Sequence, residues 1–301
     1  MKTEQLKKIT EELDNKIQNF QEDKEGLLKY LEFQSKFYRG RSFHNSLLIF
    51  MFKENSELVA TYKQWKTIHN RIVVACIVCR EFANAKCTCE EITKPIAIPQ
   101  LRPIHITQDK DGNPIEKDDQ FVFFRAYTVF DIEDTEPLND KGLRVKNPNA
   151  PIILNGSDGG EVLMLASIFI EKNGWDYHLS RPIPSGANGY TRKDTKEIVI
   201  APNPIKQQAK TTLHELAHYH LHLDDDFDYL NCRGLAEVQA ESVAFTVMKF
   251  LGLDSSDYSI AYIRGWGSDD FKEFKSSLKV IVETSQKIIQ DLQLHEGGLD
   301  D

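Results

Sequence analysis

The pattern His214-Glu215-Leu216-Ala217-His218 constrains the fold more than any other part of this 301-residue chain. Its two histidines are four residues apart, and a helix places two such side chains on one face, one turn apart. Two imidazoles arranged in this way supply half of a tetrahedral metal site. The surrounding segment, from about Ile205 to His222, is therefore predicted to be a helix that carries a metal centre.

A metal ion held by two histidines needs a further protein ligand. The next predicted helix, Gly234 to Leu251, carries Glu237 and Glu241 four residues apart on an otherwise apolar face. Carboxylates on such a face are costly to bury unless they meet a cation. We assign the ligand role to Glu237, because Glu241 then accepts a hydrogen bond from a ligand histidine. The alternatives are the reverse assignment, a solvated glutamate stripe, and His222 as a weaker ligand candidate.

Glu215 has the position of a general base. It directly follows His214 and can reach the open side of the metal, where it would take a proton from a bound water during attack on a carbonyl. The metal would lower the pKa of that water to about 7. The pattern therefore predicts a zinc-dependent hydrolase without a Ser or Cys nucleophile, and manganese is the alternative ion.

Four of the five cysteines lie close together in the sequence, at Cys76, Cys79, Cys87 and Cys89. Thiolates at such spacings can enclose a structural zinc ion, although the last pair is closer together than in usual zinc knuckles. Ordinary reduced cysteines are the alternative. Because the cluster does not look like the spread-out framework of a secreted disulfide protein, we expect a cytoplasmic protein.

Charge and hydropathy argue against two classes of partner, duplex DNA and membranes. The formal net charge of −9 argues against duplex DNA held through a general positive field, although a local basic groove is compatible with it. The longest apolar run, Ser46 to Phe52, is far shorter than the roughly 20 residues that a membrane helix needs. The N-terminus predicts a charged helix rather than a signal peptide. We therefore expect no membrane partner.

Apolar periodicity predicts an α+β protein. The first part is predicted to contain helices and then strands: helices at Thr3 to Phe20, Lys24 to Phe37, from Ser42, and Tyr62 to His69, and strands at Ile72 to Val78 and Phe121 to Phe130. After an acidic, aperiodic stretch, a mainly helical part with a small sheet is expected, with helices at Glu161 to Lys172, Ile205 to His222, Gly234 to Leu251, Ser256 to Arg264 and Asp270 to Leu292, and strands near Trp175 to Leu179 and Glu197 to Ala201. We therefore predict a mixed α/β domain over residues 1–137, a linker over 138–155 and a second domain over 156–301.

The N-terminal part resembles the single-stranded-DNA-binding domain of plasmid antirestriction proteins of the ArdC type. The resemblance runs from Tyr30 to Ile72, and its matching motifs include Ser42-Phe43-His44-Asn45-Ser46-Leu47-Leu48-Ile49, Trp65 and Arg71-Ile72-Val73. It continues at Val129-Phe130-Asp131-Ile132. The family normally follows its Trp-containing helix with a Gly- and Lys-rich turn, whereas no glycine occurs here between Gly40 and Gly112. The resemblance implies that this domain binds single-stranded DNA.

Binding to single strands combines aromatic platforms with cations. The predicted domain offers this mixture in one segment and at two nearby positions, namely Lys36, Tyr38, Arg39, Arg41, His44, Trp65 and Arg71. The alternative is that the rings fill the core of a small domain while the arginines solvate its surface.

The C-terminal part, from Gly186 to Ala244, is similar to metallopeptidases of the ImmA/IrrE kind. The match includes Gly186-Ala187-Asn188-Gly189, the His214–His218 helix and Ala236-Glu237-Val238-Gln239-Ala240-Glu241, and it is the more specific of the two. It implies a zincin domain with zinc bound by His214, His218 and Glu237, a gluzincin-like ligand set, and Glu215 as general base. The two resemblances together cover most of the chain.

We therefore expect a cytoplasmic metallopeptidase that recruits single-stranded DNA through one domain and cleaves a protein or peptide with the other. An antirestriction role, or another role tied to a mobile genetic element, is implied by the resemblance. Two alternatives remain. The protein could coat single strands stoichiometrically around a structural zinc site, or it could be a regulatory peptidase that cleaves a repressor.

Overall fold

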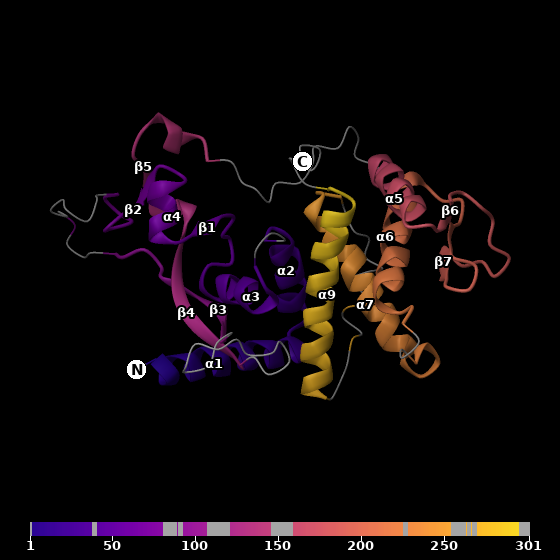
Figure 1. The fold of residues 1–301 in the computed structure, drawn as a ribbon, viewed down its shortest axis with the longest axis horizontal. Coiled ribbons are helices and arrows are strands. Elements are labelled where there is room, and N and C mark those ends of the chain that lie inside the picture. Colours follow the sequence, from indigo (N-terminus) through magenta and orange to yellow (C-terminus); the bar gives the residue numbers. More distant parts are fainter. Residues whose placement is uncertain are drawn as a thin grey trace. The chain divides into compact units, whose positions relative to one another are not determined.

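The computed structural model describes residues 2–37, 41–80, 89, 93–106, 121–145, 159–224, 228–253, 263, 266 and 270–294. The chain divides into two compact units. Unit 1 consists of Met1–Lys16 and His44–Asn147, and unit 2 consists of Ile17–Phe43 and Pro148–Asp301. Helices and short sheets occur together (Figure 1), which agrees with the α+β class expected from the sequence.

Unit 1 combines helices with two small antiparallel sheets. Its helices are α1 (Lys2–Glu22), which runs across the division at Lys16, α3 (Phe43–Phe52) and α4 (Tyr62–Thr67). The first sheet has the order β1-β4-β3, from Val59–Ala60, Phe121–Asp131 and Ile98–Ile106, and the second pairs β2 (Arg71–Val73) with β5 (Thr135–Pro137). The described part of the unit also contains two short 3-10 helices, η2 (Ile132–Asp134) and η3 (Asp140–Leu143).

Trp65 lies at the centre of a small hydrophobic core in unit 1. Its helix α4 begins at a capping box formed by Thr61 and Gln64. The Trp65 side chain is 0% exposed, its Nε1 donates a hydrogen bond to the carbonyl oxygen of Phe130 at 2.8 Å, and it belongs to a buried cluster with Leu58, Ala60 and Val73. A ring without exposed surface cannot stack on a base. The structure therefore corrects the expected role of Trp65 in nucleic-acid binding to a role in the core.

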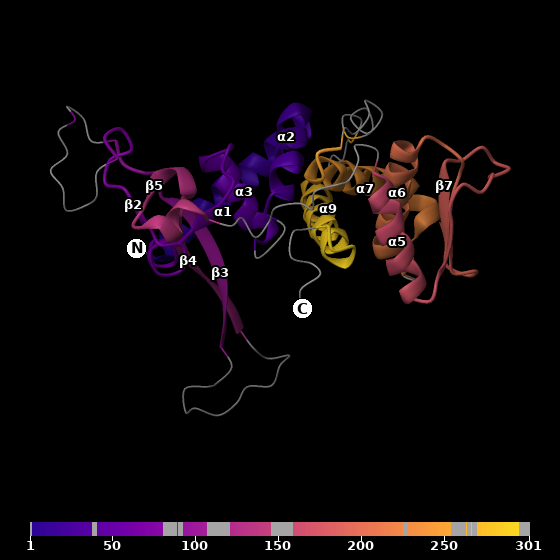
Figure 2. The same cartoon turned by 90° about the horizontal axis from the view of Figure 1, so that it is seen from above.

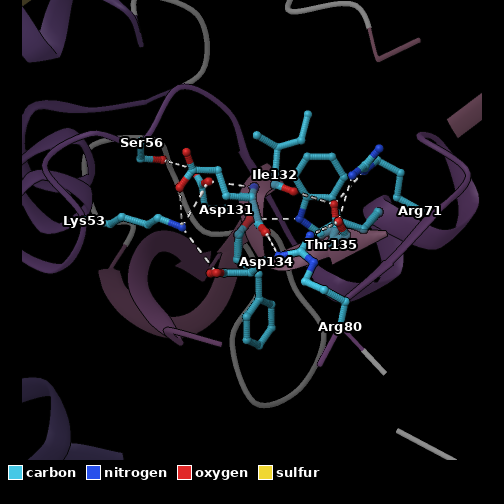
Figure 3. Close-up of polar contacts among 11 residues, drawn as sticks. Lys53, Ser56, Arg71, Arg80, Asp131, Ile132, Asp134 and Thr135 are labelled. Atoms are coloured by element: carbon cyan, nitrogen blue, oxygen red, sulfur yellow. Dashed lines mark hydrogen bonds and ion pairs between the residues drawn. The ribbon is translucent and has the colours of Figure 1, made fainter. Parts of the chain in front are cut away.

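Arg71 is also held inside unit 1. Its Nε donates to Thr135 Oγ1 at 2.6 Å, its Nη2 to the Thr135 carbonyl oxygen at 2.8 Å and its Nη1 to the Gly142 carbonyl oxygen at 2.7 Å. Figure 3 shows the guanidinium of Arg71 turned toward Thr135. These bonds join β2 to β5 and η3. Arg71, expected among the nucleic-acid-binding residues, therefore has a structural role here.

The end of β4 is fixed by a cluster of charges around Lys53. The Lys53 Nζ lies 3.3 Å from Asp131 Oδ1, 3.1 Å from Glu133 Oε2 and 3.3 Å from Asp134 Oδ1. Ser56 hydrogen-bonds to Asp131, whose other oxygen accepts from the Glu133 N–H at 2.8 Å (Figure 3). Because Lys53 and Asp134 are mostly buried, this cluster fixes the path of the chain from β4 into β5.

Unit 2 is built around three long helices, α6 (Ile205–Leu221), α7 (Tyr229–Phe250) and α9 (Phe271–Asp291). α7 packs against α6, α9 and α2 (Lys24–Ser35), while α6 packs against α5 (Gly160–Lys172) and a small sheet. In that sheet β6 (Asp176–His178) runs parallel to β8 (Glu197–Ile200), and β7 (Gly189–Arg192) pairs antiparallel with β8 as an edge strand.

Most of the helices predicted from periodicity are present with small shifts at their ends. The strands β3 and β7 were not predicted, because β3 contains Pro99 and Pro103 and β7 has a polar, glycine-containing sequence. The helix expected over 256–264 falls almost wholly outside the described residues. Among the helices that the structure does describe, none is long and apolar enough to cross a membrane.

The division into units can be compared with the expected domain limits. Residues 1–137, 138–155 and 156–301 were expected as domain, linker and domain. In the structure α2 belongs to unit 2, and η3, within the expected linker, accepts a hydrogen bond from Arg71 in unit 1. The change from unit 1 to unit 2 falls between Asn147 and Pro148, inside the stretch expected to be a linker.

We expect Arg71→Ala to lower the free energy of unfolding by about 1–3 kcal/mol, because the Gly142 carbonyl oxygen loses its Arg71 donor and Thr135 loses one of the two arginines bound to it. Denaturant unfolding, followed by tryptophan fluorescence, measures the effect. The matched control is Arg125→Ala on the exposed part of β4, which should change stability by no more than about 0.5 kcal/mol. Equal stability of both variants would contradict the structural role of Arg71.

Candidate metal centre

Three ligand atoms from α6 and α7 converge in unit 2. The Nε2 atoms of His214 and His218 are 3.1 Å apart, Glu237 Oε2 lies 3.4 Å from His214 Nε2, and Glu237 Oε1 lies 4.0 Å from His218 Nε2. Metal–ligand distances of about 2.1 Å in a tetrahedral site place ligand atoms about 3.4 Å from one another. The three groups therefore fit one divalent ion, and three protein ligands leave one position of the tetrahedron for another molecule.

The outer nitrogen of His214 is held by a buried ion pair. His214 Nδ1 lies 3.1 Å from Glu241 Oε2, and the other carboxylate oxygen of Glu241 lies 2.5 Å from Lys210 Nζ. Glu241 and Lys210 are both buried. With Glu241 as acceptor, Nδ1 of His214 carries the proton and Nε2 can present a lone pair to a metal. Glu241 thus orients a ligand histidine.

The outer nitrogen of His218 is held by a chain of hydrogen bonds that reaches α9. Gln239 Nε2 donates to Ser277 Oγ at 3.1 Å, so the Gln239 oxygen is free to accept from His222 Nε2 at 2.9 Å. His222 Nδ1 then accepts from His218 Nδ1, also at 2.9 Å. This order of donors leaves the lone pair of His218 on Nε2, the atom that faces His214 and Glu237. His222 therefore supports a ligand.

The side chain of Glu215, on α6, is held in place by residues of the edge strand β7. Thr191 Oγ1 lies 2.8 Å from Glu215 Oε2 and 3.0 Å from its backbone carbonyl oxygen. Gly189 gives the carboxylate room, because a Cβ at that position would lie 2.9 Å from Glu215 Oε1. Glu215 is only 5% exposed, and burial, together with the charge of Glu237, raises its pKa to about 7 against the opposing effects of His214 and Thr191. A carboxylate with such a pKa can exchange protons near neutral pH.

The pKa values of the two candidate ligand histidines are shifted in opposite directions. Burial lowers the pKa of His214, but hydrogen bonds to Glu237 and Glu241 outweigh burial and raise the pKa to about 9. Burial and the neighbouring His214 and His222 lower the pKa of His218 to about 3. Without a metal, a proton on His214 therefore offsets part of the negative charge of Glu237 and Glu241. A divalent ion bound there would take the place of that proton, so its binding should weaken as the pH falls.

The other predicted site residues lie in different parts of the chain. Lys36 is exposed and Arg41 half-buried in unit 2, whereas His44 is half-buried in unit 1. Tyr38 and Arg39 lie outside the described residues, as does Cys87. In unit 1 the thiols of three further predicted residues lie together, namely Cys76, Cys79 and Cys89.

Sequence reasoning missed five residues that support the centre: Thr191, Gly189, Lys210, Gln239 and Ser277. Lys210 could have been found, because it precedes His214 by four residues and so shares its helical face. Gln239 lies between Glu237 and Glu241, two positions from each. Thr191 and Ser277 had no comparable signal, since they come from a strand and a helix distant in sequence. Gly189 belongs to a motif that carries the resemblance, but the motif gave it no role beside Glu215.

Comparisons with known proteins give a distant structural likeness. No protein-family model matches the chain, and no curated protein matches its sequence. The chain is similar to crystal structures of the antirestriction protein ArdC from plasmid R388, one metal-free and one Mn(II)-bound. Each is 18% identical to this chain over 84% of both chains, and the TM-scores are 0.46 and 0.44.

We expect Gly189→Ala to destabilise the protein by about 1–3 kcal/mol, because the new Cβ would crowd Glu215 and would lie 2.7 Å from Thr211 Cγ2. Gly234→Ala is the matched control, since nothing lies within 4 Å of its added Cβ and alanine favours the interior of α7 by up to about 1 kcal/mol. Thermal or chemical unfolding measures both. Equal stability of the two variants would show that β7 does not approach Glu215 this closely.

Proposed function

We propose that this protein is a metal-dependent peptidase, with zinc as the expected ion, held by His214, His218 and Glu237. The observation that carries the proposal is the convergence of these three ligands near a buried carboxylate. That carboxylate belongs to Glu215, which lies on α6 with the two histidines. A purely structural metal site usually has four protein ligands and needs no such carboxylate. Three ligands and an adjacent proton acceptor are the arrangement that hydrolysis requires.

In the proposed reaction, a bound divalent ion supplies a Lewis acid that polarises the peptide carbonyl and lowers the pKa of water to about 7. Glu215 accepts a proton from the attacking water and returns it to the amine that leaves when the C–N bond breaks. Thr191 holds the Glu215 carboxylate in position through its hydroxyl group. Glu241 and the His222–Gln239–Ser277 chain keep both histidines oriented throughout.

The sheet next to Glu215 favours an extended peptide as substrate. β7 carries Thr191 and Gly189, and it pairs with β8 along one edge. Within the described part of unit 2, no strand pairs with its other edge. A free strand edge presents N–H and C=O groups that an extended chain can bind by adding a strand. A peptide bound there would pass the residue that we propose as general base.

We expect Glu215→Gln to reduce peptide cleavage by about 10²-fold or more, because the amide cannot accept a proton from water. The wild-type protein and the variant, each loaded with Zn²⁺ or Mn²⁺, are incubated with a proteome-derived peptide library, and new termini are detected by mass spectrometry. Metal content is measured in both and should be equal, since Glu215 is not a proposed ligand. Cleavage at the wild-type rate by Glu215→Gln would refute the assignment of the base.

A second candidate function, single-stranded-DNA binding, is favoured by the arm that β3 and β4 form in unit 1. Figure 2 shows these two strands running as a ribbon away from α1 and α3. Near the start of β4, at residues 123 and 124, the side chains of Phe123 and Phe124 are 50% and 51% exposed. Because successive strand residues point to opposite faces, both faces of the arm carry an exposed aromatic ring. Exposed rings of this kind are available to stack on a base.

One face of this arm combines an aromatic ring with cations. Phe123 and Arg125 share a face of β4, and Arg125 lies directly opposite Arg102 of β3. Two arginines opposite each other repel, which weakens the pairing of the strands unless an anion lies between them. An exposed ring beside two guanidinium groups suits a strand of nucleic acid, whose bases stack while its phosphates pair with arginine. These residues differ from the set that the sequence suggested.

We expect Phe123→Ser to weaken binding of a fluorescent single-stranded oligonucleotide about tenfold, because base stacking contributes about 1–3 kcal/mol. The matched control is Phe124→Ser, which removes an equally exposed ring from the opposite face and should leave affinity unchanged. Fluorescence anisotropy at fixed salt measures both. Equal loss in the two variants, or in neither, would contradict the proposed binding face.

The two proposals keep the antirestriction or mobile-element role that the sequence resemblance implies. In that role unit 1 would hold single-stranded DNA and unit 2 would cleave a protein that acts on it. Each proposal has its own test, since Glu215→Gln should leave DNA affinity unchanged and Phe123→Ser should leave peptide cleavage unchanged.

A further inference from the structure

We propose that unit 1 contains a second metal site, a structural zinc site formed by the thiolates of Cys76, Cys79 and Cys89. Their Sγ atoms all lie within 4.8 Å of one another, and those of Cys76 and Cys89 are 3.9 Å apart. Zinc–sulfur distances of about 2.3 Å in a tetrahedral site place sulfur atoms about 3.8 Å apart. A disulfide bond is only about 2.05 Å long. The spacing therefore fits an ion shared by the thiolates.

The backbone around Cys76 and Cys79 is folded into a turn, and the thiols of both residues lie close together. The Arg80 N–H donates to the Cys76 carbonyl oxygen at 3.0 Å, and Arg80 itself has a φ of 61°, in the left-handed region that a non-glycine residue seldom adopts. A conformation of this kind persists where the surrounding structure holds it in place. The turn thus owes its shape to contacts outside the three cysteines.

The side chain of Arg80 supplies these contacts. Its Nε lies 2.5 Å from Glu136 Oε1, its Nη1 donates to the Glu133 carbonyl oxygen at 2.6 Å, and its Nη2 donates to the Thr135 carbonyl oxygen at 2.9 Å. Figure 3 shows Arg80 and Arg71 approaching Thr135 together. The cysteine turn is therefore anchored to η2 and β5, the same elements that Lys53 and Arg71 fix.

A separate backbone hydrogen bond joins the two limbs of the cysteine segment. The Ile77 N–H donates to the Thr93 carbonyl oxygen at 2.8 Å, so the residues after β2 lie beside those that lead to β3. Cys89 belongs to the second limb, and its thiol meets Cys76 across this connection. A metal ion bound by all three thiolates would cross-link the limbs at this point.

The small core of this part of unit 1 gives a metal ion a physical role. The hydrophobic cluster near β2 has as its buried members Leu58, Ala60, Trp65 and Val73. A core of this size contributes little stability, and small domains commonly add a metal or a disulfide. Thiolate ligands select soft or borderline ions such as Zn²⁺, and their binding energy adds to the stability of the fold. The three thiolates leave a fourth position of the tetrahedron for a further ligand. Cys87 lies outside the described residues, and the proposal rests on the other three cysteines.

Metal content of the full-length protein tests the proposal. After purification with Zn²⁺ under reducing conditions and gel filtration, we expect two zinc ions per chain in the wild type, one in His214→Ala and one in Cys76→Ser. Cys232→Ser is the matched control, because it removes a free cysteine of α7 and should retain two ions. Wild-type zinc content in Cys76→Ser would overturn the proposal. If the unit 2 centre does not bind zinc, the wild-type protein should contain one ion per chain, and Cys76→Ser should contain none.

Cobalt substitution tests the same site without altering any cysteine. In the His214→Ala protein, Co²⁺ should give the intense sulfur-to-cobalt charge-transfer absorption of thiolate ligands, and added Zn²⁺ should abolish it. This measurement stands even if Cys76→Ser fails to fold. Absence of the absorption in a folded, reduced His214→Ala chain would overturn the thiolate site, whatever the outcome for the peptidase.

Discussion

The proposed metal centre of unit 2 depends on keeping three polar ligands, two of them partly exposed, in one orientation where α6 packs against α7. Buried polar groups are costly unless they are paired. Here the outer nitrogen atoms of the two histidines, which face away from the expected ion, are hydrogen-bonded. Their direct partners are Glu241 and His222, which are held in turn by Lys210, Gln239 and Ser277. The helix packing and the hydrogen-bond chain therefore support each other. Removing either would leave the histidines free to rotate, and the ligand geometry would be lost.

The two proposed metal sites use different structural supports. The centre in unit 2 lies on long helices, whose packing against each other holds the candidate ligands in place. The thiolate site in unit 1 lies in irregular chain, and hydrogen bonds from Arg80 and Ile77 set its geometry. An open centre with a nearby carboxylate suits chemistry, whereas a cross-link between two limbs of chain suits stability. Under the two proposals, zinc has two separate roles in one chain.

Unit 1 shows how tertiary contacts reassign residues that look functional in sequence. Trp65 and Arg71 have the side chains expected of a nucleic-acid site, but they form the core and the hydrogen-bonded frame of the unit. The sequence did not identify Arg102, because β3 contains two prolines and is not predicted as a strand. Phe123 and Arg125 lie in a predicted strand, but its sequence does not show which face stays exposed. Only the pairing of β3 with β4 brings the two arginines opposite each other.

The sequence by itself determined most helices of unit 2 and the candidate ligands of its proposed metal centre, with Glu237 and Glu241 as alternatives, because the four-residue spacing of His214 and His218, and that of Glu237 and Glu241, follows from the helical repeat. It also located the cysteine segment. The tertiary structure decided which glutamate meets the histidines, how Thr191 and Gly189 hold Glu215, and which aromatic rings remain exposed. These outcomes depend on contacts between segments distant in the chain, and local periodicity carries no information about such contacts.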